Sequence, residues 1–299
     1  MKTVSALVAL VIPALQLSGC GPDSPAATSI QSTAPSSPAA SPAAYEEPWL
    51  DKLVPVGGGR KLHTTCWGQG SPAVISLHGL IMPYDDASWA HRPDFRVLIA
   101  PHTTYCEYER TNVGTSSKEA GPIPITQSAH DLNALLDAIG IKQPVVLLAG
   151  SYGGQLGTLF AGTYPDRMAG IVLLDPELAN ATPKLVSYVP AKYRLPPSWK
   201  ENAERQDTVR AGALAAEVLD DIPKVPGVLF AATKDNYPSG TKVKPFMTYL
   251  RFLQRDLIGR FEPGRMFILD AGHSLEGYTD RIAAAVLRVV RLSAAHVGG

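Results

Sequence analysis

The chain has 299 residues, and its 27 Lys and Arg side chains balance 27 Asp and Glu, so the formal net charge is zero. This balance, with no basic cluster, gives no electrostatic reason to expect nucleic acid as a partner. No Cys/His cluster has the spacing of a metal site and no glycine-rich dinucleotide fingerprint is present, so we expect neither a metal nor another cofactor.

The first 20 residues have the pattern of an export signal. A single cation precedes an apolar stretch from about residue 4 to residue 17, which is too short to span a bilayer comfortably and is interrupted by Pro13. The segment ends in Leu-Ser-Gly-Cys, which resembles the lipobox of bacterial lipoproteins, in which the cysteine becomes the lipidated first residue. We therefore expect an exported protein, held by a lipid on Cys20 at the extracytoplasmic face of the cell membrane. An ordinary secretory signal, cut at another small residue, is the alternative.

Residues 21–48 are expected to form a disordered tether between this signal and the folded part. They consist mainly of Ser, Pro, Ala and Thr and cannot bury enough apolar surface to offset the entropy of ordering. Residues 49–299 then form one domain, because roughly 250 residues are enough for a sizeable core.

Apolar runs alternate with helical patterns along this domain. Six runs are continuously apolar, as expected of strands buried on both faces of a parallel sheet: residues 73–79, 95–101, 144–150, 170–176, 227–233 and 265–272. Between two of them, residues 128–140 carry apolar side chains at helical spacing and end at Gly140. The alternation predicts an α/β fold with a mostly parallel, doubly wound sheet.

Ser151 lies at the centre of the segment Gly-Ser-Tyr-Gly-Gly, between a strand pattern and a helical pattern. This is the context of a nucleophile elbow, a sharp turn that projects a hydroxyl above the sheet edge. Such a turn needs small neighbours because it is tight and strained. Ala149 stands where the usual G-x-S-x-G pattern has its first glycine. A tight strand-to-helix loop, or a phosphate-cradling turn at a helix N-terminus, is the alternative for this segment.

A serine nucleophile needs a histidine on another loop at the same sheet edge, because a base must take its proton. His273 follows directly after the apolar run 265–272 and is the candidate base; a surface histidine is the alternative. The remaining histidines lack this strand-end context or lie in the C-terminal tail, apart from His78, which we expect to shape a loop. The backbone N–H groups of Leu80 and Tyr152 are expected to form the oxyanion hole.

Together these features resemble the serine α/β-hydrolase superfamily, in particular a branch of bacterial, often exported members related to prolyl-aminopeptidase-like and esterase-like enzymes. The resemblance runs from about Lys61 to Leu292. It is carried by LHTTCWGQGSPAVISLHG, by YERTNVGTS at 108–116, which is similar to YDRxGxGxS, by LLAGSYGGQLGTLFAGTYPDRMAGIVLLDP, and by FLQRDL followed by DAGHSLE. It departs from the pattern at Ala149 and at Thr111-Asn112.

The resemblance implies an α/β-hydrolase fold in which an aspartate orients His273. Asp175 and Asp235 each follow a predicted strand, and neighbouring strands are only about 4.8 Å apart, so a side chain from either position could reach the histidine. We favour Asp175, because an extra helical segment separates Asp235 from His273 and because the aspartate after this strand is the usual partner in the branch resembled. Asp235 is the alternative acid.

The same fold implies a lid and allows a disulfide. Residues from about 176 to 226 change to proline-rich turns and amphipathic pieces, which form a lid in this fold. Aromatic residues there, Tyr188, Tyr193 and Trp199, either line an apolar cavity or pack the lid onto the core. The segments that end at Cys66 and Cys106 are neighbours in the strand order of the fold, so a disulfide between them is sterically reasonable in an exported protein.

The function implied is that of a serine hydrolase that cleaves a carboxylic ester or thioester through an acyl-enzyme. Its expected partners are a small acyl substrate and, through the lipid anchor, the membrane. A chain-release thioesterase of polyether or polyketide synthesis is one alternative, and a non-catalytic binding lipoprotein is another. Epoxide hydrolases and haloalkane dehalogenases are disfavoured, because those relatives use an aspartate where this chain has Ser151.

Overall fold

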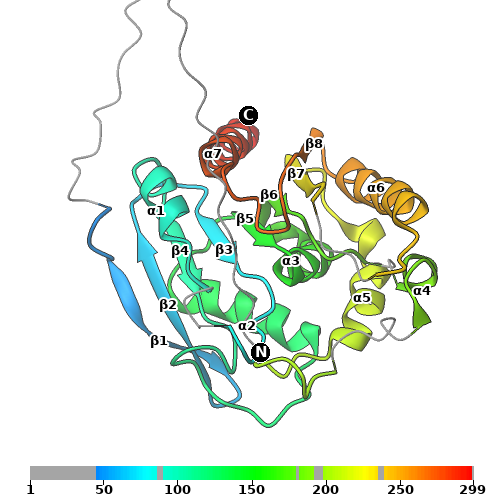
Figure 1. The fold of residues 1–299 in the computed structure, drawn as a ribbon. Coiled ribbons are helices and arrows are strands. Elements are labelled where there is room, and N and C mark those ends of the chain that lie inside the picture. Colours follow the sequence, from blue (N-terminus) through cyan, green and yellow to red (C-terminus); the bar gives the residue numbers. More distant parts are fainter. Residues whose placement is uncertain (1–44, 86–89, 180–181, 192–197, 235–238, 298–299) are drawn as a thin grey trace, which may run out of the picture. The chain divides into compact units, whose positions relative to one another are not determined.

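The computed structural model describes residues 45–85, 90–179, 182–191, 198–234 and 239–297, all within a compact unit from Ala39 to Gly299. Over these ranges the strands form one eight-stranded sheet in the order β1-β2-β4-β3-β5-β6-β7-β8 (Figure 1). The strands are β1 (Leu50–Gly57), β2 (Arg60–Trp67), β3 (Val74–Leu77), β4 (Tyr105–Tyr108), β5 (Val145–Gly150), β6 (Met168–Leu174), β7 (Gly227–Ala232) and β8 (Gly264–Leu269).

The sheet is parallel from β4 through β3 to β8, whereas β1 pairs with β2, and β2 with β4, in antiparallel register. This confirms the mostly parallel, doubly wound sheet predicted from the sequence. The chain runs from β3 outward to β4 and then crosses back to β5 on the other side of β3. The carboxyl ends of β3 and β5 therefore lie at the point where the strand order reverses, the usual position of a binding crevice in such sheets.

Helices cover both faces of the sheet. Residues of α2, α3, α5 and α6 share one buried cluster with one face, and residues of α1 and α7 share a second cluster with the other (Figure 1). The helices are α1 (Pro93–Ile99), α2 (Ile125–Ala138), α3 (Tyr152–Thr163), α4 (Thr182–Ser187), α5 (Thr208–Glu217), α6 (Val243–Gly259) and α7 (Thr279–Val297). Over the described ranges, none of them combines the length and the apolar composition that a membrane span requires.

Two of the predicted strands differ from the structure. The run 95–101 was expected to be a buried strand but forms α1, in which Pro93 occupies the first turn and Phe95 and Ile99, four residues apart, are buried. A short apolar run is compatible with either a strand or a helix. The strand in this part of the chain is β4, which follows α1 and starts at Tyr105. The run 265–272 does contain β8, but β8 is an edge strand and Ile268 is 50% exposed, so it is not buried on both faces.

The segment predicted to form a lid connects β6 to β7 and contains α4 and α5. Its second half belongs to the core, because Ala211 and Ala215 of α5 are fully buried in the cluster that also contains α2 and α3. The predicted lid therefore does not extend over α5.

Candidate active site

Ser151 occupies the sharp turn between β5 and α3. Its backbone has φ 50° and ψ −123°, a conformation that residues other than glycine rarely adopt. The segment that ends β6 and follows it fixes this turn, since the Ser151 N–H donates to the Leu174 carbonyl at 3.0 Å and the Glu177 N–H donates to the Ser151 carbonyl at 2.9 Å. The strand, the turn and the helix are thus arranged as a nucleophile elbow requires.

The small residues around Ser151 are needed because other chain segments pass close to the turn. A Cβ atom at Gly153 would lie 2.2 Å from the Leu77 carbonyl oxygen, and one at Gly154 would lie 2.4 Å from Cβ of Pro176. Ala149, in place of the usual first glycine, is accommodated because Gly157 of α3 lies next to its methyl group. The departure at Ala149 therefore does not distort the elbow.

His273 and Asp175 lie on the loops that follow β8 and β6, and they are hydrogen-bonded to each other. His273 Nδ1 is 2.7 Å from Asp175 Oδ2, while Asp175 Oδ1 accepts the Ala232 N–H at 3.0 Å. The carboxylate is buried, and the imidazole is about half exposed. Of the two candidate acids, Asp175 therefore contacts the histidine; Asp235 lies outside the described residues.

Ser151 and His273 line the same cavity, of about 500 Å³, at the carboxyl ends of the strands. The loop after β3 supplies Gly79 and Leu80 to its wall, and α1 with its preceding loop supplies Arg92 and Asp94. This volume lies in the range of small-molecule sites. The cavity thus brings the candidate nucleophile and the candidate base to one open space.

The predicted oxyanion donors flank Ser151. A Cβ atom built on Gly79 would lie 3.3 Å from Cβ of Ser151, so the loop carrying Leu80 passes directly beside the serine. Tyr152 is the first residue of α3, where a backbone N–H has no partner within the helix. Both predicted donors thus lie next to Ser151, and their binding of an oxyanion stays a prediction.

Next to this loop lies a buried network that sequence reasoning missed. Burial, and then the neighbouring Arg110 guanidinium, holds the pKa of His78 well below its usual range, so this imidazole is neutral, in keeping with a loop-shaping role. Arg110 pairs with Glu204, which lies 94 positions further along the chain. Arg110 belongs to the segment YERTNVGTS and could have been singled out from it, but Glu204 has no local sequence signal.

Asn112 shows why the second departure from the family pattern is tolerated. It has a φ of 73°, the left-handed conformation that asparagine adopts more readily than most residues. Its side-chain amide donates to the Glu204 carbonyl at 2.9 Å, and its Oδ1 accepts the Glu119 N–H at 2.8 Å. Asn112 thus contributes to the same buried network and does not line the cavity.

Cys66 and Cys106 form a disulfide between directly paired positions of β2 and β4. The chain has three cysteines, and with Cys20 assigned to the signal these two were the predicted pair. Cys20 itself lies outside the described residues. Within the described ranges, no three His, Cys, Asp or Glu residues come together in a way that could hold a metal ion.

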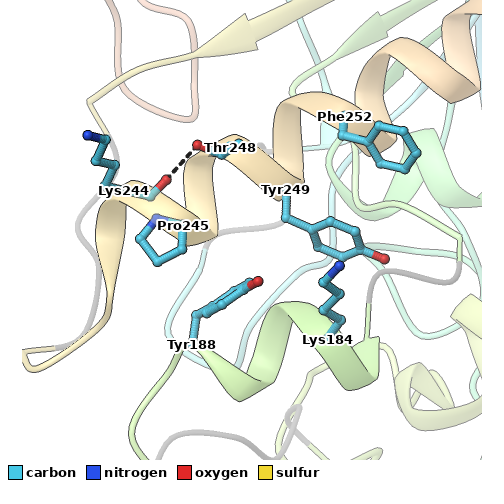
Figure 2. A pocket seen from close by; sticks show the side chains of 7 residues that line it. All are labelled: Lys184, Tyr188, Lys244, Pro245, Thr248, Tyr249 and Phe252. Carbon is cyan, nitrogen blue, oxygen red and sulfur yellow. Dashed lines mark hydrogen bonds between the residues drawn. The ribbon is translucent and has the colours of Figure 1, made fainter.

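A second hollow, of about 620 Å³, lies between α4 and α6 (Figure 2). Figure 2 shows Tyr188 and Lys184 of the α4 region facing Tyr249 of α6, and Lys184 Nζ lies 4.5 Å from the centre of the Tyr249 ring. Tyr188 therefore lines an apolar hollow other than the one around Ser151, and Trp199 lines a third. Tyr193 lies outside the described residues.

Comparison with known proteins identifies the fold. The family described as alpha/beta hydrolase fold matches residues 72–262. The lipase LipV of Mycobacterium tuberculosis is 30% identical over 201 residues, which cover 66% of this chain and 73% of the lipase. A cis-3-alkyl-4-alkyloxetan-2-one decarboxylase of Shewanella oneidensis is 30% identical over 136 residues, 42% of this chain and 41% of the relative.

The first curated relatives are matched over only about two fifths of their own length. Among solved structures, the enol-lactonase from Burkholderia xenovorans LB400 superimposes with a TM-score of 0.56 at 18% identity and covers 80% of this chain and 99% of the lactonase. The relatives are hydrolase-fold enzymes with different substrates, so they agree on the scaffold and not on the reaction. From the family match and the sheet topology together, the chain belongs to the alpha/beta hydrolase fold family.

Proposed function

We propose that the protein is a serine hydrolase in which Ser151 is the nucleophile, His273 the general base and Asp175 the residue that orients the histidine. The observation that carries this proposal is the 2.7 Å contact between His273 Nδ1 and Asp175 Oδ2, beside a cavity that His273 shares with Ser151. The strained backbone of Ser151 supports it, because strain of this kind persists where function requires it.

We propose the following reaction for these residues. Ser151 Oγ attacks the carbonyl carbon of an acyl substrate, and His273 Nε2 takes the hydroxyl proton while Nδ1–H donates to Asp175. The negative oxygen of the tetrahedral intermediate accepts the N–H groups of Leu80 and Tyr152. His273 then returns the proton to the departing alcohol or thiol, which leaves an acyl-enzyme. A water molecule, deprotonated by His273, releases the acid by the same steps.

The substrate class we propose is a carboxylic ester or thioester of moderate size. The cavity has apolar lining residues such as Leu77, Leu80 and Leu148, and charged ones, Asp85, Arg92, Asp94 and Glu276, so it offers both an apolar surface for an acyl chain and polar groups for the rest of the substrate. The similarity to a protein named as a lipase is in keeping with this class. Against a purely binding role, the nucleophile, base and acid are all present and the last two are in contact.

We also propose that the enzyme works outside the cytoplasm, anchored through Cys20. The Leu-Ser-Gly-Cys segment supports the anchor, and residues 21–48 would then be the tether between the membrane and the catalytic domain. A disulfide between Cys66 and Cys106 suits an oxidising compartment.

The test combines a fluorophosphonate probe with p-nitrophenyl esters of graded acyl length. We expect the probe to label the wild type on Ser151, and Ser151→Ala to abolish both labelling and ester turnover. Ser187→Ala is the matched control, because Ser187 of α4 is an exposed serine that does not line this cavity, and it should keep both activities. Undiminished labelling or turnover in folded Ser151→Ala would refute the assignment, and a wild type that reacts with neither probe nor ester would refute the function.

A further inference from the structure

The segment from Asn202 to Gln206, in the connection between β6 and β7, carries three buried polar side chains, whereas Arg205 is exposed. Asn202 is 2% exposed, and Glu204 and Gln206 are both 0% exposed. Most buried polar atoms in proteins are hydrogen-bonded, and within this segment Gln206 Nε2 is an exception among the described residues. Their partners therefore show what the segment does.

Glu204 holds the loop that carries Leu80. Its Oε1 accepts the Ile81 N–H at 2.7 Å, and its two oxygens accept Nε and Nη2 of Arg110 at 2.7 Å each. Arg110 in turn donates to the carbonyl oxygens of His78 and Gly79, at 2.7 and 2.6 Å. Polar contacts thus fix this loop on both sides of Leu80.

Gln206 holds the second oxyanion residue. Its Oε1 accepts the Tyr152 hydroxyl at 3.0 Å and the Ser128 hydroxyl at 3.3 Å. The Tyr152 ring is fully buried, and the Arg110 guanidinium lies 5.4 Å from its centre. The side chain of Tyr152 is therefore anchored to the same segment that anchors Leu80.

The segment itself is rigidly held. The N–H of Ala203 donates to the Ile81 carbonyl at 3.0 Å, and the Gln206 N–H donates to Asn202 Oδ1 at 2.9 Å. Arg205, between Glu204 and Gln206, has a φ of 57°, which is strained for a residue other than glycine. A segment held in this way can keep both the loop that carries Leu80 and the side chain of Tyr152 in defined positions.

We propose that residues 202–206 are the template of the oxyanion hole, with Glu204, through Arg110, and Gln206 as positioning residues. This inference rests on the proposed function and adds the element that sets the donor geometry. Donors stabilise a developing oxyanion only if they are preorganised, and a displacement of about 1 Å can cost about a hundredfold in rate. One buried segment that fixes both donor residues supplies that preorganisation.

The test uses the near-isosteric variant Glu204→Gln and measures kcat, KM, thermal stability and the affinity for a boronic acid, which forms a tetrahedral adduct on the serine. We expect kcat to fall about ten- to a hundredfold with KM changed less than about threefold, because the lost interaction acts in the transition state. Affinity for the boronic acid should fall in step with kcat, while affinity for the carboxylate product should not.

Asp131→Asn is the matched control, because it breaks another substantially buried arginine pair, Arg60–Asp131 at 2.7 Å, away from the cavity. It should lower the melting temperature and leave kcat and boronic acid affinity unchanged. Equal behaviour of Glu204→Gln and Asp131→Asn in all these measurements would overturn the inference.

Two further measurements keep the test decisive. If Glu204→Gln fails to fold, Gln206→Met, which keeps the Arg110–Glu204 pair, should still lower kcat and boronic acid affinity together; unchanged values would overturn the inference. Hydrogen exchange of residues 78–82 needs no turnover and should accelerate in Glu204→Gln but not in Asp131→Asn. A wild type whose Ser151 does not react refutes the proposed function as well, whereas a reactive wild type with unaffected variants refutes this inference alone.

Discussion

His273 and Asp175 come from loops 98 positions apart in the chain, and the Asp175 carboxylate bridges two partners, His273 Nδ1 at 2.7 Å and the Ala232 N–H at 3.0 Å. The hydrogen bond from the Ala232 N–H holds the carboxylate in place, and the carboxylate in turn orients the imidazole through its Nδ1 atom. A proton on Nδ1 then leaves Nε2 unprotonated and able to act as a base toward Ser151. The whole catalytic proposal depends on this relationship.

Replacing Asp175 with asparagine should therefore lower kcat by about four orders of magnitude, because the wrong imidazole tautomer is stabilised. The measurement is ester turnover, with circular dichroism to verify folding. Asp270→Asn is a suitable control, since Asp270 also follows a strand but is exposed and paired with Lys234. Asp235→Asn should be equally mild. A large loss in Asp235→Asn and a small one in Asp175→Asn, both folded, would move the role to Asp235.

Gly153→Ala should damage both stability and activity. The added Cβ would lie 2.2 Å from the Leu77 carbonyl oxygen and 2.5 Å from that of His78, so the loop beside Ser151 would have to move. Overpacking of this kind costs about 1–3 kcal/mol of unfolding free energy. Gly259→Ala in α6 meets no atom within 4 Å and should be neutral or stabilising by about 0.4–1 kcal/mol. Urea unfolding compares the two, and equal stabilities would contradict the expected clash.

The elbow could be predicted from sequence because all of its information is contiguous. A buried strand, a run of small residues around Ser151 and a helix follow one another within a few positions, and the structure has the same order. The position of His273 after a strand was predictable for the same reason, and its role as the base stays a prediction. The run 95–101 was not, because seven residues fit a strand or a short helix equally well and the packing of Phe95 and Ile99 decides between them.

Contacts between distant parts of the chain could not be deduced in this way. Asp175 and Asp235 both follow strands, and only the conformation of each loop determines which carboxylate reaches His273. The pairing of Glu204 with Arg110 spans 94 positions and leaves no periodic pattern at either residue. The sheet order that sets Cys66 opposite Cys106 came from the resemblance and not from the local sequence.

His91 should make stability depend on pH. Its Nδ1 lies 3.2 Å from Glu107 Oε2 and its Nε2 lies 3.3 Å from Glu109 Oε1. These two hydrogen bonds, of which the one to Glu107 has the larger effect, raise the pKa of His91 to about 9. A raised pKa means that the contribution is fully present below the ordinary value of about 6.5 and is lost as pH rises through about 9. Because the His91 side chain is 30% exposed, solvent screening reduces the full effect, and on the order of 2–3 kcal/mol of unfolding free energy should disappear over that range.

The check is urea unfolding at pH values from 6 to 10. His91→Gln should be less stable than the wild type at pH 6 and should lack the decline between pH 6.5 and 9. Burial raises the pKa of Glu109, but the hydrogen bonds from His91 and from the Thr115 N–H outweigh it and lower that pKa to about 2. The His91–Glu109 contact thus shifts the pKa of both partners, and its contribution to stability is counted once. A variant with the same decline as the wild type would assign it to another group.

Removing the disulfide should lower the free energy of unfolding by about 2–4 kcal/mol, because Cys66 and Cys106 close a loop of 40 positions in the unfolded chain. The double variant Cys66→Ala/Cys106→Ala is compared with the wild type by urea unfolding, with and without a reducing agent. Reductant should shift the wild-type midpoint toward that of the variant and leave the variant unchanged. A wild type that is insensitive to reductant once unfolded and refolded would show that the disulfide contributes little.

Cys20→Ala should detach the protein from the membrane or block its maturation, because acyl anchoring requires that thiol. The measurement is incorporation of labelled palmitate, together with fractionation of cells that express the full chain. The double variant Cys66→Ala/Cys106→Ala is the control, since these two cysteines are buried in the sheet and bonded to each other, and its lipid label should persist. An unlabelled wild type found free in the medium would favour the ordinary secretory signal. Because the proposed catalytic residues, Ser151, Asp175 and His273, are far from Cys20 in the sequence, Cys20→Ala should keep the specific activity of the wild type. Any loss of ester turnover in cells would then come from failed export and not from the active site.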